Sequence, residues 1–316
     1  MKTNEISKTF YSKLKCKFFV LGSPLDGESI MFVLYGDDQI IYSCITDSFV
    51  VDKSNIPIAV ADQYGIDYIT DVFWTHPHDD HSEGLIEIIE KFKPEHVYIP
   101  SNLHTLPDVI PKISKSVLDK INEYKSYDRR YKYQPAVVDI GANYNLLNQM
   151  LNVAGKKVPF HIYAIAPVIG KARRDVITNM FNSLNDFSIA ISVNVGDFSA
   201  LLTGDLQNQM INYMHDELQE KITTPNLFKI PHHGSTSSLE IVSFFDETYK
   251  IDAAITTAKK SSKLPQNDVL NSYGGYCEKI YKIGDDSIKF SVYCAEVDIL
   301  NATIKVVDNQ NYVLHS

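Results

Sequence analysis

A cluster of histidines and acids behind an apolar run is the feature that most constrains this chain. Residues 69–74 form the run, and the stretch "THPHDDHSEG" that follows holds three histidines and three acids. The run predicts a buried strand, which would hold the loop behind it rigidly enough for a metal site. His76 and His78 can converge on one point, while Asp80 and His81 can face a second point nearby. The sequence therefore predicts ligands for two adjacent metal ions.

The same pattern, an apolar strand followed by polar groups, occurs twice more. In "SALLTGDL", Asp205 follows an apolar strand and a tight glycine turn. In "LFKIPHHGSTSS", His232 and His233 follow a strand over residues 227–230, and Gly234 allows a close backbone approach. A lone "TGD" is usually a turn, and "HHG" alone is weak evidence for a metal site. Three clusters with one pattern nevertheless indicate one site, with Asp205 as a bridging carboxylate and a histidine as the distal ligand.

The order of strand and helix patterns predicts an α/β fold. Residues 17–44 read as an antiparallel meander, residues 144–152 as helical or loop-like, and residues 280–307 as short strands. Strands and helices recur in both halves, so we expect two mixed β-sheets packed face to face with helices outside. We expect a single domain over residues 1–316, with an insertion or extended helical segment at about 104–135. The lysines and arginines of that segment are typical of a solvated helix face.

Composition excludes several classes of protein. A net charge of −9 argues against a generally basic surface that coats nucleic acid, so the basic segments 112–132 and 171–174 would steer a polyanion only locally. No apolar run reaches membrane-spanning length and no signal peptide is evident, so we expect a cytoplasmic protein that does not enter a membrane. The four cysteines form no CxxC pair and are expected to be reduced thiols.

Taken together, these motifs resemble those of the metallo-β-lactamase superfamily. "THPHDDH" resembles its HxHxDH signature, and "LDGESIMFVL" resembles its opening strand. "NDFSIAISVNVGDFSALLTGDL", followed by "LFKIPHHGSTSS", is most similar to the hydrolase domain of competence DNA-uptake (ComEC-type) proteins. The resemblance covers most of the chain. It implies the metallo-β-lactamase αββα sandwich, in which two mixed β-sheets are flanked by helices.

The resemblance also implies how the first cluster divides between two divalent metal ions. His76 and His78 would bind the first ion, and Asp80 and His81 the second. Asp205 would bridge the two.

The second cluster and the departures from the family pattern leave some roles open. His233 would close the second site and His232 would face substrate, although these two roles can be exchanged. The family's further histidine before the bridging aspartate is absent, so Asn185 or Asp186 would complete the first site weakly. Oxygen-rich ligation makes Mn²⁺ a candidate beside Zn²⁺. Asp47 would hold a ligand histidine from outside the site.

The reaction that this resemblance implies is hydrolysis by a hydroxide that bridges two metal ions. We expect a phosphodiesterase or nuclease acting on a phosphodiester such as DNA or RNA, with Asp80 and His232 as catalytic groups. Ser235, Thr236 and Lys259 would bind substrate, with a helix N-cap and a solvated lysine run as the alternative interpretations.

Two other kinds of function remain open from the sequence. One is a hydrolase of small esters, lactones or phosphorylcholine. The other is a metal-poor pseudo-enzyme that acts as a partner-binding subunit. Whichever function holds, a protein partner from a bacterial operon system is also expected by analogy with the family, and the oligomeric state is not determined by the sequence.

Overall fold

Two large mixed β-sheets form the centre of the protein. The structure, a computed structural model, describes residues 6–25, 27–103, 106, 110–126, 133–178, 183–218, 222–284 and 289–312. Within these residues the strands form two eight-stranded sheets and one two-stranded ribbon. The ribbon pairs β5 (Val50–Val51) with β6 (Ser54–Asn55).

The first sheet combines an antiparallel half with a parallel half. Its order is β18 (Thr303–Tyr312), β17 (Phe290–Asp298), β2 (Leu14–Gly22), β3 (Glu28–Gly36), β4 (Gln39–Thr46), β7 (Asp71–Phe73), β8 (His96–Pro100) and β9 (Ala136–Ile140). The pairs from β18 to β4 are antiparallel, as the expected meander requires, and those from β4 to β9 are parallel.

The second sheet is also antiparallel in one half and parallel in the other. Its order is β1 (Phe10–Tyr11), β10 (Tyr144–Val153), β11 (Lys156–Ala166), β12 (Ala190–Val195), β13 (Phe198–Leu202), β14 (Leu227–Lys229), β15 (Ala253–Thr257) and β16 (Ile280–Ile283). Strands β10 to β13 pair antiparallel, while β13 to β16 pair parallel. β1 joins β10 in parallel.

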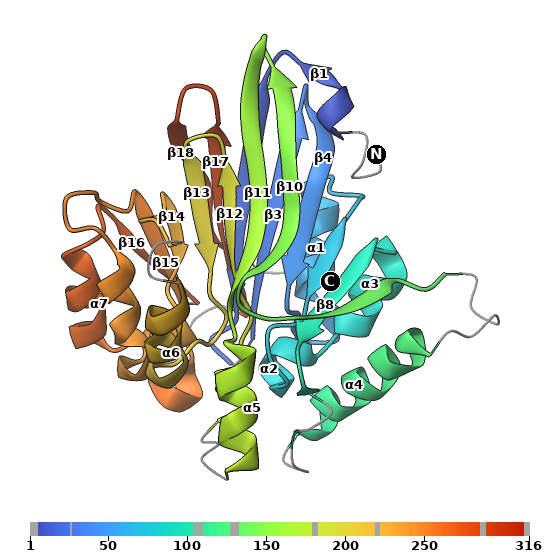
Figure 1. Cartoon of the computed structure of the whole chain (residues 1–316), viewed down its shortest axis with the longest axis vertical. Helices are drawn as coiled ribbons and strands as arrows, with labels where there is room; N and C mark the ends of the chain where they lie inside the picture. Colours follow the sequence, from blue (N-terminus) through green and yellow to red (C-terminus); the bar gives the residue numbers. More distant parts are fainter. Residues whose placement is uncertain are drawn as a thin grey trace.

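Helices cover the outer faces of both sheets (Figure 1). The α-helices are α1 (Ile56–Gln63), α2 (Asp79–Ser82), α3 (Leu85–Phe92), α4 (Lys112–Lys125), α5 (Ile169–Ile177), α6 (Asn208–Leu218) and α7 (Asn267–Gly274). The short 3-10 helices are η1 (Ile6–Lys8), η3 (Leu184–Phe187), η4 (His232–Gly234), η5 (Thr236–Phe244) and η6 (Lys260–Ser262). Helices α1 and α3 lie on one side of the sandwich and α6 and α7 on the other. The expectation of two mixed sheets flanked by helices is therefore confirmed.

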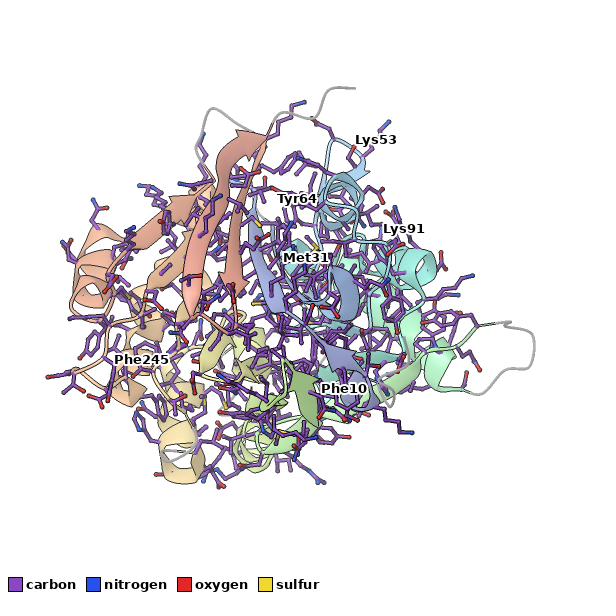
Figure 2. The ribbon with its side chains drawn as sticks, turned by 90° about the horizontal axis from the view of Figure 1, so that it is seen from above. Phe10, Met31, Lys53, Tyr64, Lys91 and Phe245 are labelled. Atoms are coloured by element: carbon purple, nitrogen blue, oxygen red, sulfur yellow. The ribbon has the colours of Figure 1, made fainter. Side chains whose placement is uncertain are left out.

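The hydrophobic core has two parts because central strands bury both of their faces. Along β2, Phe18 and Val20 join a cluster that draws residues from both sheets. The alternate residues Phe19 and Leu21 pack in a second cluster that includes the helices. Successive side chains of a strand point to opposite faces, so a strand between two apolar layers is apolar throughout. Figure 2 shows Met31 of β3 amid densely packed side chains.

Two expectations for individual elements were wrong. Residues 144–152 are neither helix nor loop but most of β10, which pairs with β11 along its length. Leu151 and Val153 point into the core in strand alternation, which the intervening asparagines and glutamine obscured. The C-terminal region is not all short strands, since β17 and β18 form a long hairpin. This hairpin joins the first sheet beside β2, a pairing between the two ends of the chain that no local pattern indicates.

The segment about 104–135 falls partly outside the described residues, which omit 104, 105, 107–109 and 127–132. Its helix α4 packs against α2, α3 and β9. Val117 and Ile121 of α4 are buried, while Lys115 and Lys125 are exposed, so these two lysines lie on a solvated face. Among the described residues, no helix combines the length and apolar character needed to cross a membrane.

Candidate metal centre

The three polar clusters meet at one edge of the sandwich, where parallel strands of both sheets end. β7 leads to His76 and His78, β13 leads to Asp205, and β14 leads to His233. The carboxyl ends of parallel strands share one edge of a sheet. The face-to-face packing of the two sheets therefore brings polar groups that lie far apart in the sequence into one place.

The first two histidines point their rings toward each other. His76 is fully buried, and its Nδ1 lies 2.9 Å from Thr75 Oγ1. Its Nε2 lies 3.0 Å from His78 Nδ1. Burial lowers the pKa of both rings, which keeps them in the neutral form that ligates metals. Thr75 therefore directs His76 Nε2 toward His78.

Asp47 holds the third histidine from behind. His81 Nδ1 lies 2.8 Å from Asp47 Oδ2, and Asp47 also accepts hydrogen bonds from the backbone N–H and the hydroxyl of Thr75. Asp47, His76 and His81 offer atoms within 4.8 Å of one another. Since both Asp47 oxygens already accept hydrogen bonds, we regard Asp47 as an outer support for His81, the role expected for it from the sequence.

Asp205 lies at the centre of the histidines. Its Oδ2 is 3.6 Å from His81 Nε2, 3.8 Å from His233 Nε2 and 4.0 Å from His76 Nε2. These separations are too long for hydrogen bonds, and Asp205 is 1% exposed. One carboxylate oxygen thus faces three imidazole nitrogens in the protein interior.

His233 approaches Asp205 from the second sheet on an unusual turn. His232, His233 and Gly234 all have positive φ angles, of 47°, 54° and 74°. Left-handed backbone costs about 1–3 kcal/mol at a residue other than glycine, so surrounding contacts must impose it. Burial lowers the pKa of His233 to about 4, so its ring is neutral near pH 7.

Three buried polar atoms of this cluster have no hydrogen-bond partner among the described residues: His81 Nε2, His233 Nε2 and Asp205 Oδ1. Unsatisfied groups of this kind are rare and each costs about 1–3 kcal/mol. Asp80, His81 and His233 offer ligand atoms within 4.8 Å of one another. Nitrogen and carboxylate donors that face one another in this way suit a divalent cation such as Zn²⁺ or Mn²⁺. The residues present therefore fit a metal.

The charges around His81 also favour a cation. Burial alone would lower the pKa of His81, but the carboxylates of Asp205, Asp80 and Asp47 outweigh it and hold the pKa well above its ordinary value. The site thus concentrates negative charge in the interior, which a bound cation would neutralise.

Asp80 faces a lysine at the rim of the site. Its Oδ2 lies 3.8 Å from His81 Nε2 and 2.5 Å from Lys259 Nζ. Burial would raise the pKa of Asp80, but His81 and Lys259 lower it to about 2. Asp80 is therefore ionised at any working pH, and Lys259 provides positive charge next to it.

His232 lies beside the cluster rather than within it. Its Nε2 is 3.3 Å from Asn185 Nδ2, and its Nδ1 is 2.8 Å from Ser237 Oγ. Asn185 and Asp186 are both buried in the 3-10 turn η3. Because His233 and not His232 faces Asp205, the geometry favours His233 as the ligand and leaves His232 toward substrate.

The two hydroxyl residues that follow the histidine pair have structural positions. Ser235 is the N-cap of η5 and accepts a hydrogen bond from Ser237 N. Thr236 is exposed, and its carbonyl accepts a hydrogen bond from Asn208. The N-cap interpretation therefore describes Ser235, and a substrate contact at either residue stays a prediction.

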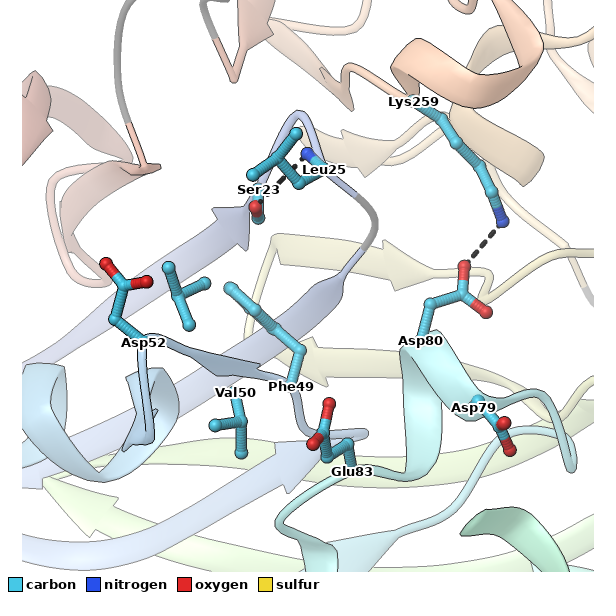
Figure 3. A pocket seen from close by; sticks show the side chains of 10 residues that line it. Ser23, Leu25, Phe49, Val50, Asp52, Asp79, Asp80, Glu83 and Lys259 are labelled. Atoms are coloured by element: carbon cyan, nitrogen blue, oxygen red, sulfur yellow. Dashed lines mark hydrogen bonds and ion pairs between the residues drawn. The ribbon is translucent and has the colours of Figure 1, made fainter. Parts of the chain in front are cut away.

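A pocket of about 420 Å³ opens beside Asp80 and Lys259 (Figure 3). Its wall contains the acids Asp52, Asp79, Asp80 and Glu83, the polar Ser23 and the apolar residues Leu25, Phe49, Val50 and Val51. The dashed line in Figure 3 marks the Lys259–Asp80 ion pair. The pocket therefore borders the cluster at Asp80.

Sequence reasoning missed a second set of supporting residues behind His233. Its Nδ1 is 2.7 Å from Thr257 Oγ1, which donates a hydrogen bond to Glu28. Glu28 Oε1 is 2.5 Å from Lys229 Nζ, and both side chains are buried. A lysine inside the apolar stretch "LFKIP" was the one local signal that could have drawn attention to this set.

The sequence was compared with family models and with curated proteins. No family model matches the sequence. No curated protein matches it either.

Solved structures with a similar arrangement include metallo-hydrolases. The metallo hydrolase Igni18 from Ignicoccus hospitalis has 9% identity and a TM-score of 0.47, over 89% of this chain and 98% of that one. A protein from Thermotoga maritima, described as a Zn-dependent hydrolase of the metallo-β-lactamase superfamily, has 11% identity and a TM-score of 0.32, over 84% and 98%.

A variant of the CmlA β-hydroxylase has 11% identity and a TM-score of 0.47 over 87% of this chain. The chain spans about half of that protein, 53%. Likeness at this level does not carry an activity from any of these proteins to this chain.

Proposed function

We propose that this protein is a metal-dependent hydrolase. The observation that carries the proposal is the group of three buried and unsatisfied atoms: His81 Nε2, His233 Nε2 and Asp205 Oδ1. The outer nitrogen of each histidine is already held, by Asp47 and by Thr257. Native proteins rarely bury such a group without a bound ligand, ion or water, because each unsatisfied member destabilises the fold.

The proposed ligand set comprises the six residues expected from the sequence: His76, His78, Asp80, His81, Asp205 and His233. Divalent cations held by them would supply Lewis-acid chemistry, which polarises a phosphoryl or carbonyl oxygen and makes water a better nucleophile near neutral pH. We propose two cations because these six ligands divide into two groups around Asp205.

The chain's own residues would then orient the reaction. The ionised Asp80 carboxylate can orient the attacking water by accepting a hydrogen bond from it. Lys259 can bind an anionic oxygen of the substrate beside it. His232 would face the leaving group, and burial lowers the pKa of its ring, so the neutral ring adds no charge there.

Phosphodiester hydrolysis is the reaction that we favour. A phosphodiester carries a negative charge, which Lys259 complements at the mouth of the pocket. A nuclease additionally needs a surface that binds a polyanion. Lys171 and Lys125, from the two basic segments, form ion pairs with Asp216 and Asp139, which weakens the case for such a surface.

Hydrolysis of a small ester, lactone or phosphorylcholine is the second candidate. It is favoured by the four acids in the pocket wall, of which Asp80 pairs with Lys259 and Asp52 pairs with Lys289. A wall of this charge would repel a long nucleic acid and admit a small neutral or cationic group.

The test is a metal-resolved hydrolysis assay. Protein stripped with chelator and reloaded with Mn²⁺ or Zn²⁺ would be given bis-p-nitrophenyl phosphate, p-nitrophenyl acetate, and single- and double-stranded DNA. The His78→Ala variant removes a proposed ligand. His161→Ala is the matched control, because His161 lies on β11 and was not expected to be a ligand.

We expect metal-dependent cleavage of bis-p-nitrophenyl phosphate that His78→Ala abolishes and His161→Ala preserves. Cleavage of p-nitrophenyl acetate alone would favour the second candidate, a hydrolase of small esters. Cleavage of DNA would extend it to a nuclease. If the wild-type protein binds neither cation, the hydrolase proposal fails and the partner-binding alternative takes its place.

A further inference from the structure

A buried ion pair joins the two sheets directly behind the candidate metal centre. Glu28 begins β3 in the first sheet, and Lys229 ends β14 in the second. Lys229 Nζ lies 2.5 Å from Glu28 Oε1, and the two side chains are 0% and 2% exposed. Burying two charges costs several kcal/mol per ion before their attraction is counted. Stabilisation of the fold is therefore a weak explanation for the presence of this buried ion pair.

The pair is connected to His233 through one hydroxyl group. Thr257, at the end of β15, donates its hydroxyl proton to Glu28 Oε2. The same Oγ1 lies 2.7 Å from His233 Nδ1. Glu28 Oε2 is 3.6 Å from His233 Nδ1, too far for a direct hydrogen bond. Any influence of Glu28 on the ring therefore passes through Thr257.

The direction of these hydrogen bonds follows from the chemistry of the groups. A lysine ammonium only donates and an ionised carboxylate only accepts. The Thr257 hydroxyl must then give its single proton to Glu28, and its oxygen can only accept from His233 Nδ1. A neutral imidazole carries one N–H. With that proton on Nδ1, the Nε2 lone pair faces Asp205, which is the state a metal ligand needs.

We propose that Glu28, held by Lys229, is a positioning residue that sets the tautomer of His233 through the Thr257 hydroxyl. The proposal rests on the proposed function, because a metal is what would use the exposed Nε2 lone pair. It explains why two charges are buried where the sheets meet. It also explains why Nε2 has no hydrogen-bond partner among the described residues.

Glu28→Gln should reverse the direction of the hydrogen bonds that link residue 28, Thr257 and His233, without removing either hydrogen bond. The amide oxygen would remain toward Lys229, so the NH₂ group would face Thr257 and donate to it. The Thr257 hydroxyl would then donate to His233 Nδ1, and the ring proton would move to Nε2. Thr257→Val tests the same link in another way, because loss of the hydroxyl lets Nε2–H point to Asp205 Oδ2, 3.8 Å away.

The neighbouring residue on β15 provides a matched control. Thr256 is equally buried, and its hydroxyl has no hydrogen-bond partner among the described residues. Thr256→Val therefore makes the same chemical change on the same strand without touching His233.

The experiment reads the tautomer by ¹⁵N NMR of the histidine rings in the full-length, metal-free protein, and then measures Co²⁺ affinity by optical titration. We expect the Nδ1–H form of His233 in the wild type and in Thr256→Val, and the Nε2–H form in Glu28→Gln and Thr257→Val. Co²⁺ should bind the last two about 10–100-fold more weakly, the usual effect of losing an outer support of a ligand.

The outcomes separate this proposal from the function on which it rests. An Nε2–H ring in the wild type, or an unchanged tautomer in both Glu28→Gln and Thr257→Val, overturns the positioning role. The expected tautomers without any Co²⁺ binding by the wild type would uphold the positioning role and overturn the metal-dependent function. If Glu28→Gln does not fold, the Thr257→Val spectrum decides.

Discussion

Asp47 shows how one side chain can orient several others. It accepts hydrogen bonds from the backbone and hydroxyl of Thr75 and contacts His81 Nδ1, while Thr75 in turn contacts His76. The residue itself has a φ of 59°, which an aspartate tolerates better than most residues. One carboxylate thus orients two proposed ligands.

We predict that Asp47→Asn lowers divalent-metal affinity about 10–100-fold. The amide removes the charge that holds His81 and leaves only one acceptor oxygen. Asp71→Asn is the control, because Asp71 is a buried aspartate that contacts His96 Nδ1 at 2.9 Å, outside the ligand set. Chelator competition measures both variants, and equal losses in the two would contradict a specific role for Asp47.

Lys259 permits a second prediction at a single residue. Its ion pair with Asp80 is mostly buried, with side-chain exposures of 18% and 13%. A charged hydrogen bond contributes about 1.5–3 kcal/mol. Lys259→Ala should therefore lower kcat/KM for an anionic substrate by about 10–100-fold. Lys263→Ala, on the same loop but exposed, should leave it unchanged. A loss confined to neutral substrates would contradict the assignment.

At the scale of elements, the turn η4 determines which histidine enters the centre. Two successive left-handed residues turn the ring of His233 inward and leave His232 at the rim. Gly234 completes the turn at a φ of 74°, and a Cβ at this position would lie 2.8 Å from Pro265 Cβ.

We predict that Gly234→Ala destabilises the protein by about 2 kcal/mol or more, because left-handed backbone costs an alanine about 1–2 kcal/mol before the contact with Pro265 is counted. Gly274→Ala is the matched control, since Gly274 ends helix α7 with nothing within 4 Å of its Cβ position. That change should be neutral or stabilising. Chemical denaturation measures both, and similar values for the two would refute the argument.

At the scale of the whole molecule, the candidate centre links the two sheets. His76, His78 and His81 follow β7 of the first sheet, whereas Asp205 and His233 follow β13 and β14 of the second. A cation held by both groups is bound by the folded chain and not by the unfolded chain, so it must stabilise the fold.

We therefore predict that chelator lowers the melting temperature reversibly. A cation at 100 times its dissociation constant adds about 2.7 kcal/mol, which corresponds to roughly 5 °C for a chain of this size. Differential scanning calorimetry with EDTA and then with excess Zn²⁺ measures the shift. His233→Ala should lose most of it. A shift that survives in this variant would indicate metal binding elsewhere.

Local sequence determined the parts of this protein that depend on neighbouring residues. The antiparallel meander, the alternation of strands and helices, and the polar clusters behind apolar strands could all be predicted, because each pattern extends over a few residues. The identity of the six proposed ligands followed from those clusters and from the family resemblance, and the structure brings them together at one edge.

Only the tertiary structure decided what depends on distant residues. The choice of His233 over His232 requires the left-handed turn, and β10 was recognised as a strand only through its pairing with β11. Glu28 and Lys229 meet across 201 positions of sequence (229 minus 28). Long-range contacts of this kind leave almost no local pattern, because the free energy that selects them comes from burial between sheets rather than from the preferences of adjacent residues.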